Sequence, residues 1–444
     1  MPDRQTSQRP AARNPLPEGT VAVAMGLVIS GAAAYIFLKL TRAGLGTDER
    51  ASPINQLWFM TFLLAPGFFL PVEQEVGRAL AHRRALGQGG GPVIRRASLL
   101  ALMLAGATTL LLAAISPLVV RKLFDGHWLL FACLVLAFLS YASAHLARGV
   151  FSGSGRFNSY GIVMGADGIV RVLGCALLAG FGVKALGWYG LAVGIPPMVA
   201  VFLALRGQHD LLPPGPDADW RELTPNLGWL VLGSVMGAIL VNAGPIAAGL
   251  LKKPDQKALV NHFTYAVLIT RVPLFMFQAV QAALLPKLAR LAARGAYDEF
   301  RSGFRKLLML VIAVGIVGVG GALVLGPFAV KLFSKEADVS RRTVGMLALA
   351  SALYMVGLAM AQAVIALRGH ARVAGGWAMG VAALVVVTTF AGHDLLLRVE
   401  SGLVAGCTVA TIAFAFALRS RLQAGIMPDE DSLTEAMLDL KLEP

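Results

Sequence analysis

Charged residues are scarce in this chain of 444 residues: they make up only 14% of it, while 57% of the residues are hydrophobic. A soluble protein of this size has too small an interior to hide so much apolar side chain. The mean hydropathy of +0.69 points the same way. The scarcity of charge therefore excludes an ordinary water-soluble enzyme or binding domain.

Other absences restrict the chemistry. The chain has three cysteines, Cys133, Cys175 and Cys407, which lie in apolar stretches without the spacing of metal ligands or of a disulfide framework. It contains no G-x-x-x-x-G-K-[ST], H-E-x-x-H or G-x-S-x-G sequence, and its seven histidines are scattered. We therefore expect no enzymatic activity, no cofactor and no metal site.

Long apolar runs are what the sequence has in abundance. Each run is long enough to cross a hydrocarbon layer of about 30 Å as a helix. The predicted fold is an all-α polytopic membrane protein with about 12 transmembrane helices in two parallel six-helix lobes. The predicted spans are 20–40, 53–76, 97–120, 128–147, 159–181, 186–205, 225–250, 262–286, 304–328, 344–367, 373–392 and 401–419.

The basic loops predict the orientation of these spans. Blocks rich in arginine and lysine at 78–96 and 287–306 are expected on the cytoplasmic side. This assignment places both termini in the cytoplasm of a bacterial-type cytoplasmic membrane. The net charge of +14 is spread over short loops, so it does not predict a nucleic-acid partner. The predicted segments are a cytoplasmic N-terminal segment 1–18, an N-terminal lobe 19–207, a cytoplasmic linker 208–224, a C-terminal lobe 225–420 and an acidic cytoplasmic tail 421–444.

An internal repeat supports the division into two lobes. VVRKLF at 119–124 recurs as AVKLF at 329–333, and the Lys-Leu-Phe triplets are 209 residues apart. The two long basic loops, which start at 78 and 287, have the same offset, and the small basic loops at 147–161 and 366–376 align at an offset near 214. An offset of six spans gives both halves one orientation, as in transporters built from parallel repeats.

Arg271 lies in the apolar stretch LITRVPLFMFQAVQ at 268–281, near the middle of a predicted span. Such a charge normally faces a partner or a wet cavity, because it costs about 2.5–3.5 kcal/mol at the bilayer centre. Gln278 and Gln281 are predicted on the same polar face, on a helix kinked by Pro273. The alternatives are a substrate-facing or gating arginine, and one paired with Asp167, Glu73 or Glu75 as a structural lock.

A second charged group lies in the span at 159–181. Asp167 and Arg171 are four residues apart and can pair on one helix face. The pair is either a neutralised packing element or a second cationic or gating element. Glu73 and Glu75, near the end of the second span, are either solvated or contribute to gating or ion coupling.

The stretch RVPLFMFQAVQAALLPKLARLAARG at 271–295, the basic loop after it and the two six-span halves resemble polysaccharide flippases of the MOP superfamily, the multidrug/oligosaccharidyl-lipid/polysaccharide exporters. The likeness is greatest to the Wzx-type branch. It implies an exporter that flips a glycan on a polyprenyl pyrophosphate for cell-surface polysaccharide synthesis. Arg271 and Arg171 would then bind the pyrophosphate, with Gln278 and Gln281 lining the path.

Two other functions remain open at this point. One is a cation-coupled exporter of small amphipathic compounds on the same fold, in which Asp167 would be required. The other is a membrane glycan polymerase or ligase, which the short external segments disfavour. The expected partners are the lipid-linked glycan, membrane lipids and a polysaccharide polymerase or glycosyltransferases.

Overall fold

The computed structural model describes residues 19–223, 227–274, 277, 291–292 and 294–424. Within these ranges the regular secondary structure is helical, which confirms the prediction of an all-α polytopic membrane protein. The helices of the first half are α1 (Thr20–Leu45), α2 (Asp48–Ala85), α3 (Gly91–Lys122), α4 (Trp128–Gly153), α5 (Phe157–Gly180), α6 (Leu186–Gly194), α7 (Pro196–Leu205) and the 3₁₀ turn η1 (Trp220–Glu222). Those of the second half are α8 (Leu227–Leu251), the 3₁₀ turn η2 (Pro254–Gln256), α9 (Lys257–Thr270), α11 (Tyr297–Lys331), α12 (Arg341–Ala366), α13 (His370–Phe390) and α14 (Leu395–Ala424).

Eleven segments among the described residues are long and apolar enough to cross a membrane. They agree with the predicted spans in order, but several helices are longer than the hydropathy indicates. The prediction at 53–76 covers only the middle of α2, and the prediction at 304–328 falls short of both ends of α11. Charged residues at the helix ends lower the local hydropathy without interrupting the backbone hydrogen bonds.

Two predicted spans are broken. The span at 186–205 consists of α6 and α7, which meet at Ile195 because Pro196 and Pro197 supply no backbone N–H. The span expected at 262–286 contains most of α9, which ends at Thr270 with Arg271 as its C-terminal cap, and residues 272–274 are helical again. Pro273 has no backbone N–H to donate to the carbonyl of Ile269 four residues earlier, so the helical hydrogen bonds are interrupted at this point.

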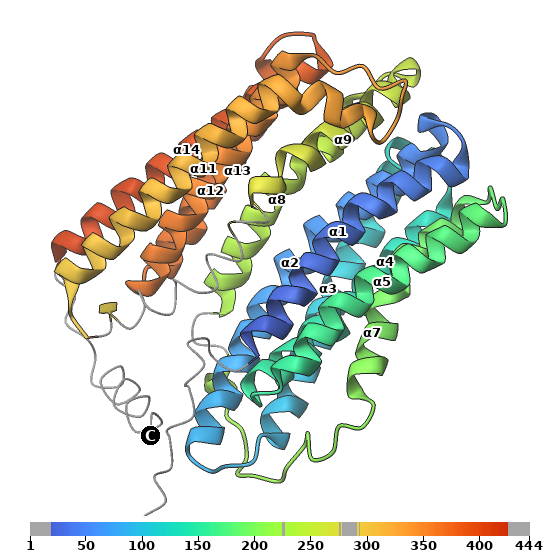
Figure 1. The fold of residues 1–444 in the computed structure, drawn as a ribbon. Helices are drawn as coiled ribbons and strands as arrows, with labels where there is room; N and C mark the ends of the chain where they lie inside the picture. Colours follow the sequence, from blue (N-terminus) through green and yellow to red (C-terminus); the bar gives the residue numbers. More distant parts are fainter. Residues whose placement is uncertain (1–18, 224–226, 275–276, 278–290, 293, 425–444) are drawn as a thin grey trace, which may run out of the picture.

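The helices form two lobes that lie side by side (Figure 1). In the first lobe α1 packs on α5, α2 on α4, and α5 on α7. In the second lobe α8 packs on α13, α11 on α12, and α14 on both α12 and α13. The two lobes meet where α2 packs against α8 and α9, and the largest hydrophobic core continues across this contact.

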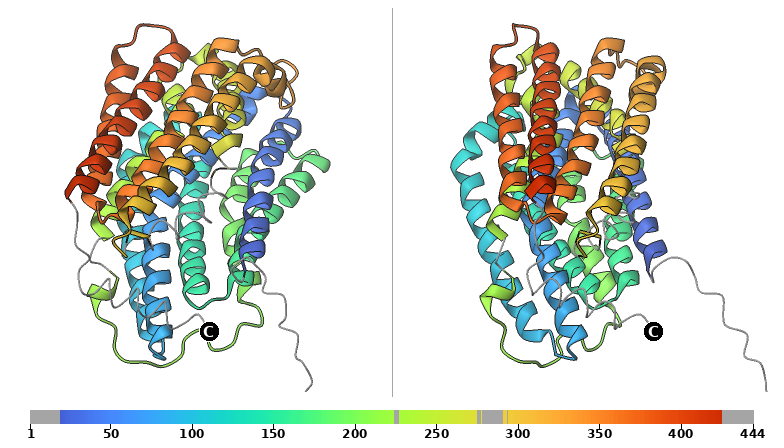
Figure 2. Two further views of the ribbon diagram at one scale, coloured as in Figure 1. Left: turned by 60° about the vertical axis from the view of Figure 1, so that its left-hand side comes forward. Right: turned by 90° about the vertical axis from the view of Figure 1, so that its left-hand side faces the viewer.

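The first residues of α1 and the last residues of α14 lie at the same end of the bundle (Figure 2). We call this the terminal end and the opposite one the far end. The predicted orientation places the terminal end in the cytoplasm.

Candidate functional site

The candidate site lies where α9 ends against α2 and α8. Arg271 is only 7% exposed there. Its guanidinium donates one hydrogen bond to Asn242 Oδ1 at 3.1 Å and another to the backbone carbonyl of Val241, both on α8. It also lies over the ring of Phe59 on α2, 5.3 Å from the ring centroid. Arg271 therefore contacts both lobes.

Two prolines create the acceptors at this contact. A proline inside a helix leaves the carbonyl four residues earlier without its usual donor. Pro245 in α8 frees the carbonyl of Val241, to which Arg271 donates. Pro66 in α2 frees the carbonyl of Phe62, which accepts a hydrogen bond of 3.2 Å from Asn242 Nδ2 across the lobe contact. Arginine and asparagine thus satisfy backbone that the sequence leaves unpaired inside the membrane.

The charge of Arg271 is not neutralised by these contacts. Its hydrogen-bond acceptors are an amide and a peptide carbonyl, and no ion pair between it and an aspartate or glutamate is found among the described residues. Asp167 and Glu73 bond other side chains, and Glu75 pairs with Arg78. The alternative of a structural lock between Arg271 and one of these three acids is therefore not what the structure shows. A buried cation with neutral acceptors attracts an anion strongly.

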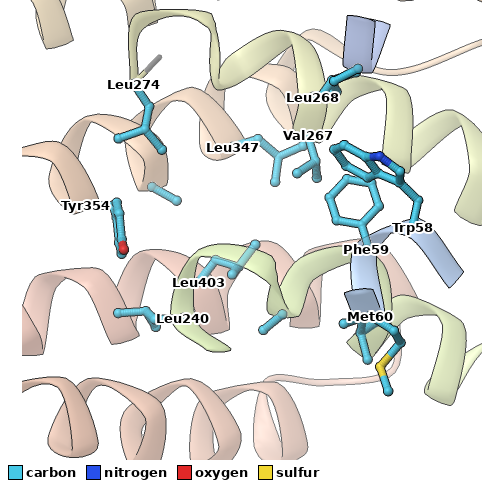
Figure 3. Packing of buried hydrophobic residues seen from close by; sticks show 14 of the residues in the cluster. Trp58, Phe59, Met60, Leu240, Val267, Leu268, Leu274, Leu347, Tyr354 and Leu403 are labelled. Atoms are coloured by element: carbon cyan, nitrogen blue, oxygen red, sulfur yellow. The ribbon is translucent and has the colours of Figure 1, made fainter. Parts of the chain in front are cut away.

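A small pocket adjoins Arg271 within the second lobe. It is lined by residues of α8, α9, α12 and α14, including Thr270, Tyr354, Leu403 and Cys407. Its free space is about 30 Å³, which is enough for about one water molecule. Figure 3 shows the apolar side chains packed in this region, among them Phe59, Leu240 and Tyr354.

Arg171 has different surroundings, inside the first lobe. Its NH2 lies 2.6 Å from Asp167 Oδ1 and 2.6 Å from the hydroxyl of Tyr141, which itself donates to Asp167 Oδ2 at 2.9 Å. Arg171 is 1% exposed and lies over the ring of Phe62. The predicted pairing of Asp167 with Arg171 is therefore present, and it includes a tyrosine from α4.

Glu73 forms the centre of a second buried cluster in the first lobe. Its carboxylate accepts hydrogen bonds from Arg148 at 2.7 and 3.0 Å and from the hydroxyl of Tyr160 at 2.8 Å, and it contacts His145 Nδ1 at 2.8 Å. The cluster joins α2, α4 and α5. Glu73 is thus no solvated interface residue, because it is only 6% exposed. Glu75 lies outside the cluster.

Sequence reasoning finds part of this arrangement. It places Arg271 and the Asp167–Arg171 pair at membrane depth, but it overlooks His145 and Arg148, although both lie within or beside the predicted span at 128–147. An ionisable residue in a span was the available signal. Gln278 and Gln281 lie outside the described residues, and α9 ends before them.

Comparison with known proteins identifies the fold. No protein-family model matches the chain. An uncharacterised protein of Mycobacterium tuberculosis is 27% identical over 266 residues, which cover 57% of this chain and 59% of that protein. The chain thus spans less than two thirds of the length of this relative.

Two solved structures show the same architecture over nearly the whole chain. A multidrug resistance MATE family transporter of the MOP superfamily, in an inward-facing conformation, aligns with a TM-score of 0.69 at 16% identity, over 92% of this chain and 98% of that one. A MOP superfamily transporter from Pyrococcus furiosus, described as having a binding pocket of reverse polarity, aligns with a TM-score of 0.65 at 14% identity, over 92% and 96%. The chain therefore has the fold of the MATE transporters of the MOP superfamily.

Proposed function

We propose that this protein exports a lipid-linked oligosaccharide, carried on a polyprenyl pyrophosphate, across the cytoplasmic membrane by alternating access of its two lobes. The observation that carries the proposal is the buried, uncompensated charge of Arg271 at the contact between the lobes. A pyrophosphate is a dense anion, and an arginine offers it both charge and several hydrogen-bond donors. The lipid tail would remain in the bilayer.

The neighbours of Arg271 suit a site that opens. The guanidinium of Arg271 contacts the backbone of α8 and an aromatic ring of α2, so a movement of one lobe against the other changes its surroundings. The break of α9 at Arg271 is the kind of helix interruption that marks substrate sites near the membrane centre in other transporters. In this proposal Gln278 and Gln281 line the path beyond the break.

The Asp167–Arg171 pair has a supporting role in this proposal. Arg171 already has a carboxylate and a hydroxyl partner and is almost fully covered. A substrate would have to displace Asp167 to use its charge. We therefore assign the pair, together with the Glu73 cluster, to holding α2, α4 and α5 in one unit that moves as a whole, and Glu75 to the edge of that unit.

The test is mass spectrometry of lipids that co-purify with the full chain in nanodiscs. Wild type is compared with Arg271→Ala and with Arg305→Ala, a matched control because Arg305 is an exposed arginine on α11. We expect wild type and the control to retain a polyprenyl-pyrophosphate glycan and Arg271→Ala to retain at least about tenfold less, the loss expected for a charge-assisted contact. Equal retention by Arg271→Ala would remove this arginine from the binding site.

A second candidate function is cation-coupled export of small amphipathic compounds. It is favoured by the likeness to a transporter described as a multidrug resistance protein. Its ion-binding acid would be Asp167, which here accepts hydrogen bonds from Arg171 and Tyr141. Bulk phospholipid alone in all three samples, together with drug tolerance that requires Asp167, would favour this function over glycan export.

A further inference from the structure

The repeated Lys-Leu-Phe motif lies at the far end of the bundle in both lobes. Lys122 ends α3 and Lys331 ends α11, so each motif leads into the loop that follows its helix. Phe124 is fully buried, and the ring of Phe333 stacks on Tyr265 of α9 with a centroid separation of 5.1 Å. Each loop is thereby held against the protein.

The residue after the second motif crosses to the first lobe. Ser334 donates a hydrogen bond of 2.7 Å from its hydroxyl to Asp48 Oδ2, and Asp48 is the first residue of α2. Both side chains are buried, at 4% exposure each. The loop after α11 therefore contacts the opposite lobe at the start of a helix.

The residue after the first motif makes the corresponding contact in the other direction. Asp125 lies 3.1 Å from Lys257 Nζ, and Lys257 is the first residue of α9 in the second lobe. Ser334 follows Asp125 by 209 residues, and Lys257 follows Asp48 by the same 209. The two contacts are thus equivalent under the internal repeat, although one is a hydrogen bond and the other an ion pair.

The Asp48 contact is the more extensive of the two. Its carboxylate also accepts hydrogen bonds from Asn261 Nδ2 at 3.0 Å and from the hydroxyl of Tyr265 at 3.0 Å. It lies 3.3 Å from His262 Nε2 and forms an ion pair with Arg42 at 3.0 Å. Asp125 has fewer and longer contacts: Lys257 at 3.1 Å and Lys252 at 3.8 Å, with Lys257 33% exposed. Ion pairs that are open to water contribute less than buried ones.

We propose that the two Lys-Leu-Phe loops form a two-part latch that holds the lobes together at the far end, and that the Asp48 half carries most of its strength. The carboxylate of Asp48 accepts hydrogen bonds from several donors of the other lobe. The lobes can separate at this point only when the carboxylate and its donors exchange those bonds for hydrogen bonds with water. The latch rests on the lobe movement that the proposed function requires, but not on the identity of the substrate.

The test measures the separation of the lobes directly. Spin labels are placed at Phe181 and Phe390, exposed residues that follow α5 in the first lobe and end α13 in the second, after the three buried cysteines are replaced by alanine. We expect wild type in nanodiscs to show mainly the short distance. Asp48→Asn should lower the ratio of closed to open lobes at least about tenfold, because charge-assisted bonds are lost, and Asp125→Asn should lower it less.

Two further variants keep the test decisive. Asp338→Asn changes an exposed acid in the same loop as Ser334 and should leave the distances as in wild type. The exchange Asp48→Ser with Ser334→Asp moves the carboxylate to the lobe that already carries Asn261, Tyr265 and His262. Arg42 is then its charged partner across the contact, and the closed population should recover only in part. Wild-type distances in folded Asp48→Asn, or an equal shift in Asp338→Asn, would overturn the latch. Because no substrate is added, failure of the lipid measurement leaves this result unaffected.

Discussion

The two lobes differ in the partners of the arginines inside their helix bundles. In the first lobe Arg171 and Arg148 each contact a buried carboxylate, Asp167 or Glu73, and a tyrosine hydroxyl completes each cluster. In the second lobe Arg271 has a carbonyl, an amide and an aromatic ring as partners. The same side chain is neutralised in one lobe and keeps its full charge in the other.

This difference assigns separate tasks to the two kinds of arginine. A buried ion pair fixes the packing of the helices that carry it, and breaking it leaves an unpaired charge. A buried cation without a carboxylate keeps its capacity to bind an anion, and the cost of burying it has to be met by the surrounding fold. The ion pairs of the first lobe therefore hold its helices together, whereas in the proposed function the second lobe supplies the charge for the substrate.

The largest effect is expected from breaking the pair in the first lobe. Arg171→Ala leaves Asp167 charged and buried with one hydroxyl donor, which should lower the free energy of unfolding by about 3–5 kcal/mol. Thermal unfolding of the purified protein in detergent measures the loss. As the control, Asp167→Ala/Arg171→Ala removes both charges and should recover part of the stability. A melting temperature equal to that of wild type in Arg171→Ala would show that the pair does not hold the lobe.

Removing the charge of Arg271 should affect stability far less. Arg271→Met relieves the burial of an uncompensated cation, but it leaves Val241 and Asn242 each without one donor, at about 1–3 kcal/mol for each unsatisfied group. The two contributions oppose each other, so we expect the free energy of unfolding to change by about 1 kcal/mol or less, under the same conditions as for Arg171→Ala. A loss as large as that of Arg171→Ala would make Arg271 a structural residue and remove the contrast between the lobes.

The contrast between the lobes was only partly predictable from the sequence. Asp167 and Arg171 are neighbours on one helix, so helical spacing alone brings them together. The partners of Arg271 are a carbonyl and an amide on α8, and their place depends on Pro245 and on how two helices pack. Neither residue spacing nor hydropathy predicts which groups of α8 lie next to Arg271.

The fold itself follows more directly from the sequence. Apolar runs and the repeat of 209 residues predict the helices and the two lobes, since backbone groups in the membrane have to be hydrogen-bonded within the protein and a helix does this for nearly all of its own. The same repeat, seen as Lys-Leu-Phe, also marks the loops of the proposed latch. The sequence does not mark Asp48, the residue that the second of these loops contacts, as important. Asp48 precedes the predicted span at 53–76, where an acidic residue is expected in a solvent-exposed loop.

The linker between the lobes belongs structurally to the first one. Arg83 of α2, only 3% exposed, donates to both carboxylate oxygens of Glu222 at 2.9 Å and to the carbonyl of Pro216 at 2.7 Å. We therefore expect the linker to move with the first lobe. Weakening this contact tests whether that lobe extends beyond its membrane helices.

The smallest effect is expected from Glu222→Gln. The hydrogen bond from Arg83 holds the pKa of Glu222 below its ordinary value. A carboxyl group whose pKa is lowered on folding stabilises the folded state above its unfolded pKa, and this contribution disappears as the pH falls through the lower, folded value. At pH 7 the substitution should lower the free energy of unfolding by about 1 kcal/mol or less and increase the rate of proteolysis within 208–223. In acid, where wild-type Glu222 is itself protonated, the two proteins should be cleaved at similar rates.

Glu299→Gln, at an exposed acid on α11, serves as the control and should match wild type throughout. If Glu222→Gln were cleaved like wild type at pH 7, the linker would not be fastened to the first lobe by this contact, and the lobe would end with α7.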